Sequence, residues 1–117
     1  MKKYLTLLLC VGLVTFYSCG DDDMETCETS NLTYTNDIAP IINASCGSAA
    51  CHGSDTMTSF PMGNYEEASF AVTFGRIVGA INHEEGFLPM PYPEGAAKLD
   101  QCNIDKITAW INDGAPE

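Results

Sequence analysis

Residues 43–53 read Asn43-Ala44-Ser45-Cys46-Gly47-Ser48-Ala49-Ala50-Cys51-His52-Gly53. Four small residues separate the two cysteines, and a histidine directly follows the second cysteine. Small side chains let the backbone approach a bound group closely. The adjacency of Cys51 and His52 keeps a thiol and an imidazole on one turn of the chain. The stretch therefore predicts a site for a group that takes two thiols and one imidazole.

A c-type haem is such a group. It needs two thiols for its vinyl groups and an adjacent imidazole for its iron, usually spaced C-x-x-C-H. The spacing here is C-x4-C-H, which predicts thioethers at Cys46 and Cys51 and an iron ligand at His52. Two alternatives stay open. One is a disulfide between Cys46 and Cys51, which is reasonable in an exported protein. The other is a zinc site, for which adjacent Cys51 and His52 would be a poor chelating pair.

Helical periodicity precedes the two cysteines. The apolar side chains Tyr34, Ile38, Ile41 and Ile42 recur with the spacing of one helix face, which predicts a helix over residues 35–44. Pro40 is compatible with such a helix only in its first turn.

A second helix is expected to begin after Asn64. This side chain can cap the helix, and Glu67 three residues later completes a capping box. The pattern breaks near Gly75 and resumes over residues 76–81.

The third helix has the clearest signals. Asp100 is expected to cap residues 101–112, with Leu99 and Ile104 placed as a hydrophobic staple. Its apolar face should contain Ile104, Ile107 and Ile111 with Trp110 beside them, and Gly114 followed by Pro116 should end it.

Long loops connect these helices. They cover residues 53–63 and 86–98, and the second contains Pro89, Pro91 and Pro93. Loops of this length are unusual in so small a domain unless they wrap something. The fold class is therefore all-α, with about three helices and long loops around a bound group.

Both ends of this region resemble small monohaem cytochrome c domains. Residues 34–43, running into Cys46…Cys51-His52-Gly53, are similar to the N-terminal helix and haem motif of that family. The end of the chain is similar to its Met-Pro loop and C-terminal helix, with Leu88-Pro89-Met90-Pro91, Leu99-Asp100, Trp110-Ile111 and Asp113-Gly114-Ala115-Pro116. The middle matches poorly. The resemblance implies a cytochrome c-like fold around one covalent haem c, and an electron carrier rather than an enzyme.

The second axial ligand of the iron is expected to be Met90. A thioether commonly lies opposite histidine in cytochromes c and raises the reduction potential. The fixed φ values of Pro89 and Pro91 would hold the Met90 sulfur in place, and the resemblance also indicates Met90. The alternatives are Met57, Met62 and His83. Met57 and Met62 could equally fill gaps in the core, and His83 would give a bis-histidine site.

The N-terminus resembles the leader of a bacterial lipoprotein. Lys2 and Lys3 precede an apolar run over residues 4–14, too short to span a bilayer comfortably. Ser18-Cys19-Gly20 is similar to a lipobox, which implies cleavage before Cys19 and acyl chains, palmitate among them, on that residue. A non-lipidated signal peptide or a signal anchor is the alternative.

The expected organisation is a signal peptide over residues 1–18, an acidic tether over 19–33 and a haem domain over 34–117. Asp21-Asp22-Asp23 fits a solvated tether and also resembles export signals of surface lipoproteins from Bacteroidetes-type bacteria. We therefore expect an exported protein, anchored by lipid to the cell envelope at the outer membrane. Cys27 and Cys102 remain once the other thiols are assigned, and they are expected to form one disulfide.

The charge of the chain limits its partners. Asp and Glu number 16 against 5 Lys and Arg, a formal net charge of −11. This balance excludes a nucleic-acid surface and a basic patch for anionic lipids. It favours a redox partner protein with a basic docking surface. The protein is expected to be a monomer that carries one electron. The alternatives are a haem protein with an open iron site, peroxidase-like or a sensor, and a disulfide-stapled surface lipoprotein without haem.

Overall fold

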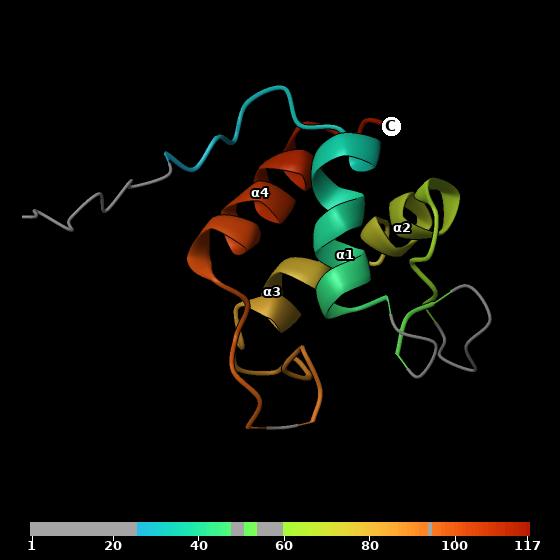
Figure 1. Cartoon of the computed structure of the whole chain (residues 1–117). Coiled ribbons are helices and arrows are strands. Elements are labelled where there is room, and N and C mark those ends of the chain that lie inside the picture. Colours follow the sequence, from blue (N-terminus) through green and yellow to red (C-terminus); the bar gives the residue numbers. More distant parts are fainter. Residues whose placement is uncertain (1–25, 48–50, 54–59, 94) are drawn as a thin grey trace, which may run out of the picture.

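The computed structural model describes residues 26–47, 51–53, 60–93 and 95–117. These residues contain helices and no strand, so the expected all-α class is confirmed. The helical segments are η1 (Tyr34–Ile38), α1 (Ala39–Ser45), α2 (Tyr65–Val72), α3 (Ile77–Ile81) and α4 (Gln101–Asn112). In the view of Figure 1, α1 lies between α4 and α2, and α3 lies near the lower ends of α1 and α4.

The first helix begins with a widened turn. Thr33 caps η1, its side chain accepting a hydrogen bond from the Asn36 amide, and η1 runs directly into α1. Pro40 is the second residue of α1. The predicted helix over residues 35–44 is therefore present, but its first turn is a π-helix. A wider turn accommodates the missing N–H and the ring of a proline better than an α-helical turn.

The N-caps predicted for α2 and α4 are confirmed, while the Glu67 carboxylate accepts from the Gly63 amide at 2.9 Å, one residue before the partner that a capping box uses. Asn64 accepts a hydrogen bond from the Glu67 amide at 2.9 Å and starts α2. Asp100 accepts one from the Asn103 amide at 3.0 Å and starts α4. The break near Gly75 separates α2 from α3, and Gly75 has a positive φ of 64°, which glycine adopts without strain.

The core lies between the first helix and α4. All four apolar residues of the predicted first face are buried, and α4 contributes Ile104, Ile107 and Trp110. Ile111, expected on the same face, is only partly buried, because the helix instead turns the larger Trp110 ring inward. The remaining buried apolar residues are Leu32, Met62, Ala68, Ala71, Ile81 and Ala115.

Trp110 joins the two ends of the domain. Its ring lies 6.0 Å from that of Tyr34, and its indole N–H donates to the Pro116 carbonyl at 2.7 Å. The same carbonyl accepts from the Tyr34 amide at 3.0 Å. The C-terminal residues are thereby fixed against the start of η1, as Figure 1 shows.

The packed region extends beyond residue 34 toward the N-terminus. Leu32, in the segment expected to be a polar tether, is 3% exposed in the core. Cys27 and Cys102 form a disulfide, which is the pairing expected from the sequence. The final residues of that segment are therefore attached to the first turn of α4. Residues 1–25, including the expected leader and Cys19, lie outside the described residues.

Removal of this disulfide is expected to destabilise the domain without changing the cavity described below. The bridge closes a loop across a sequence separation of 75 residues, and cross-links of long loops contribute about 2–4 kcal/mol. Cys27→Ala combined with Cys102→Ala should lower the free energy of unfolding by this amount in urea denaturation. A midpoint unchanged from the parent would contradict a stabilising role for the bridge.

Candidate functional site

An apolar cavity of about 550 Å³ lies at the end of the molecule where α1 and α3 meet the long loops. Ligand sites in proteins measure roughly 300–1,000 Å³. The cavity brings together the residues expected to hold haem, namely Cys46, Cys51, His52 and Met90. Its other walls are lined by Ile42, Ser45, Phe60, Met62, Ala68, Ala71, Phe74, Arg76, Ile77, Ala80, Ile81, Phe87, Leu88, Pro91, Tyr92, Ile107 and Trp110.

The two thiols lie at the C-terminal end of α1. Cys46 is the C-cap residue of α1, and its amide donates to the Ile42 carbonyl at 2.7 Å. The Cys46 carbonyl in turn accepts from the His52 amide at 3.0 Å, which closes the loop between the cysteines. No disulfide joins Cys46 to Cys51 in this structure. Burial raises the pKa of the Cys46 thiol, and the neighbouring Cys51 raises it further.

His52 is oriented by a backbone carbonyl. Its Nδ1 lies 2.6 Å from the carbonyl oxygen of Phe60. Because a carbonyl oxygen can only accept, Nδ1 carries the proton, and in the neutral ring Nε2 keeps its lone pair. The His52 carbonyl also accepts from the Met62 amide at 2.7 Å. Residues 60–62 therefore hold both the imidazole and the backbone of His52.

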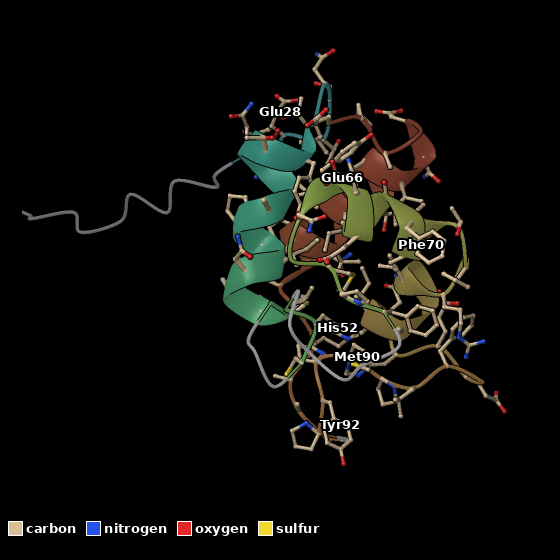
Figure 2. The ribbon with its side chains drawn as sticks, turned by 90° about the vertical axis from the view of Figure 1, so that its right-hand side faces the viewer. Glu28, His52, Glu66, Phe70, Met90 and Tyr92 are labelled. Carbon is tan, nitrogen blue, oxygen red and sulfur yellow. A yellow bond between two sulfur atoms is a disulfide. The ribbon has the colours of Figure 1, made fainter. Side chains whose placement is uncertain are left out.

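Met90 comes from the loop between α3 and α4. It is half-buried and lines the same cavity as His52, and Figure 2 shows both residues at the same end of the molecule. Met62 also lines the cavity but is only 9% exposed, within the core. Met57 lies outside the described residues. His83 is half-buried and does not line the cavity.

Exposed aromatic residues continue the cavity wall toward solvent. Phe60 and Phe74 line the cavity with ring centroids 4.8 Å apart, and Phe70 on α2 lies 5.1 Å from Phe74. Phe70 is 60% exposed, and in Figure 2 it lies on the side of the molecule away from α1. Tyr92, in the loop between α3 and α4, is also exposed, at 66%.

Arg76 is the positively charged residue of the cavity wall. Its guanidinium carbon lies 5.2 Å from the centroid of the Phe87 ring, in a cation–π contact. The Phe87 ring covers Gly79 of α3 so closely that an added Cβ atom would lie 2.6 Å from it. The sequence does not indicate that Arg76 and Phe87 line the site, since no local pattern connects them.

Candidate ligands for a free metal ion do not gather within the described residues. The described ranges contain no cluster of three or more His, Cys, Asp or Glu side chains that could hold one. Within the same ranges, no helix has the length and apolar character that crossing a bilayer requires.

Comparison with known proteins gives no relative for this chain. No protein-family model matches the sequence. No characterised protein and no solved structure matches it either. The function is therefore inferred from the residues and their arrangement.

Proposed function

We propose that the protein is a c-type cytochrome that carries one electron through a single covalent haem. The observation that supports this proposal is the placement of Cys46, Cys51, His52 and Met90 around one apolar cavity. These residues include both attachment thiols and two axial ligands of the kind used in cytochromes c. The proposal includes the small cytochrome c-like fold that the sequence implies.

Attachment of haem would use free thiols at Cys46 and Cys51. Each thioether forms when a thiol adds to a haem vinyl group, with the sulfur bonding one vinyl carbon and the proton passing to the other. No external oxidant enters this balance. Free thiols at Cys46 and Cys51 are therefore suitable reactants, whereas a disulfide between them would first need reduction.

The hydrogen bond of His52 suits an iron ligand. Histidines that bind metals nearly always donate their second ring nitrogen to a carboxylate, a backbone carbonyl or water. The Phe60 carbonyl takes that role for Nδ1 and leaves Nε2 for coordination. Haem bound here would supply one-electron exchange at its iron, and histidine with methionine is the axial pair that raises its potential.

The apolar lining should exclude water from the bound group. Ile42, Ile81 and Ile107 line the cavity and are nearly fully buried, so this part of the wall is already packed against the core. Arg76 is the residue that could pair with an acidic group of the cofactor, since its guanidinium is a permanent donor.

The partner is proposed to be a redox protein with a basic docking surface. The formal charge, −11 for the whole chain and −13 once Lys2 and Lys3 are removed with residues 1–18, would attract such a surface over a distance of about the Debye length, roughly 10 Å at 0.1 M salt. Association should therefore slow as salt is added.

Attachment to the envelope through Cys19 completes the proposal, and Cys19→Ala tests it. The substitution is expected to give unprocessed or soluble protein, because acyl chains on Cys19 would supply the membrane affinity. Partition into a detergent phase measures this. Cys10→Ala, in the leader, is the matched control and should partition as the parent does. An unchanged membrane fraction for Cys19→Ala would indicate a transmembrane leader or a membrane-bound partner instead.

The carrier function is tested by spectroscopy and voltammetry of the purified protein. A haem spectrum with reversible one-electron oxidation and reduction, and no carbon monoxide binding by the parent, is the expected result. Ready binding of carbon monoxide would favour an open iron site, peroxidase-like or a sensor. A protein without haem would favour a disulfide-stapled surface lipoprotein.

A further inference from the structure

The C-terminal end of α3 and the residues after it hold the backbone of Met90 at two points. The Met90 amide donates to the Ala80 carbonyl at 3.0 Å. The Met90 carbonyl oxygen lies 2.9 Å from Nε2 of His83. Since a carbonyl can only accept, Nε2 carries the proton and donates it. The polar backbone groups of Met90 are thus bonded to the last turn of α3 and to His83, two residues beyond that helix.

His83 reaches Met90 because the chain turns sharply after α3. α3 ends at Ile81, and His83 follows in the left-handed region with φ of 55°. Its amide donates to the Ala80 carbonyl at 3.2 Å, the same oxygen that accepts from Met90. Histidine is among the residues enriched in this conformation.

The neighbours of Met90 cannot replace its amide donor. Pro89 and Pro91 have no N–H, so Met90 supplies the amide donor of this three-residue segment. Without the His83 bond, the Met90 carbonyl would lose its acceptor contact at a half-buried position. The His83 imidazole is therefore one of two hydrogen-bond partners that fix the Met90 backbone beside the cavity.

We propose that His83 is a positioning residue that holds Met90 in place as the iron ligand, and not a ligand itself. The inference rests on the proposed haem function. His83 lies outside the cavity wall, and its Nε2 is engaged by the Met90 carbonyl. Its effect on the iron is exerted through Met90, by limiting how often the thioether leaves its position.

Two substitutions separate this role from a general role in the turn. His83→Gln keeps an N–H donor at about the same distance from Cα, while His83→Leu has similar size and no donor. Both replacements meet the same left-handed backbone at residue 83, so the cost of that conformation is similar in both variants. Three properties are measured on the full-length, haem-loaded protein: the thioether-to-iron absorption band of the oxidised form, the reduction potential and carbon monoxide binding. Hydrogen exchange of the Met90 amide gives a readout that does not depend on the iron.

His83→Leu is expected to weaken the absorption band, lower the potential, make carbon monoxide binding detectable and speed Met90 amide exchange by about three- to tenfold. That factor corresponds to the loss of one hydrogen bond. His83→Gln should resemble the parent. Suppose that the parent holds haem and shows the thioether band. If both variants then resemble the parent, or if both lose the band equally, the positioning role is overturned while the carrier function stands. A parent without the thioether band whose iron becomes high-spin in both variants would make His83 the ligand. A parent without haem overturns the carrier function and this inference together.

Discussion

Replacing Cys46 and Cys51 together with Ala is expected to abolish haem attachment and to unfold much of the domain. Both thiols line the cavity, and an unfilled space of about 550 Å³ beside the core would leave its apolar wall in contact with water. The parent should keep its haem through denaturing gel electrophoresis and show a peroxidase-active band. The double variant should show no such band and reduced helicity by circular dichroism.

The disulfide cysteines provide the matched control for this experiment. Cys27→Ala with Cys102→Ala also removes two cysteines, but neither residue lines the cavity. This variant should keep the haem band while losing stability. If the Cys46 and Cys51 double variant retained bound haem and full helicity, the attachment site would be wrong.

Met90→Ala is expected to convert the carrier into a protein with an open iron site. A thioether is a soft neutral ligand that favours Fe(II), so its loss should lower the reduction potential. The iron should become high-spin and react with carbon monoxide or peroxide, which absorption spectroscopy measures. The free energy of unfolding should fall by ~2–4 kcal/mol, through the lost ligand contact and the cavity left by the side chain.

Met62→Ala is the control for this substitution. Met62 lines the same cavity but is buried in the core, and its amide donates to the His52 carbonyl, a bond that Ala retains. The variant should lose stability by a similar amount and keep the parent spectrum. A high-spin iron in Met62→Ala but not in Met90→Ala would mean that Met62, and not Met90, is the iron ligand.

The elements that the sequence predicted are those with local signals. Asp100 and Gly114 mark the ends of α4, and Asn64 marks the start of α2, because capping involves residues only a few positions apart. The π-helical first turn of η1 was not predicted. A proline within an apolar helical pattern indicates an irregularity but does not specify which kind of turn relieves it.

Apart from the Cys27–Cys102 disulfide and the placement of Met90 beside His52, contacts between distant segments were not predicted. The burial of Leu32 depends on packing against residues far along the chain, and nothing in its polar surroundings indicates it. The Phe60 carbonyl that orients His52 is a backbone group, and every residue carries one. The sequence indicates His83 only as an alternative iron ligand, and its polar neighbours give no sign of a contact with Met90. Its bond to Met90 depends on how the loop after α3 folds back.

The measurement that tests the covalent haem most directly is the mass of the intact protein under denaturing conditions. We expect the polypeptide to carry the mass of one haem, and peptide mapping to locate that mass on the fragment with Cys46 and Cys51. A polypeptide without added mass, or one lighter by two hydrogen atoms through a disulfide between these cysteines, would contradict the proposal.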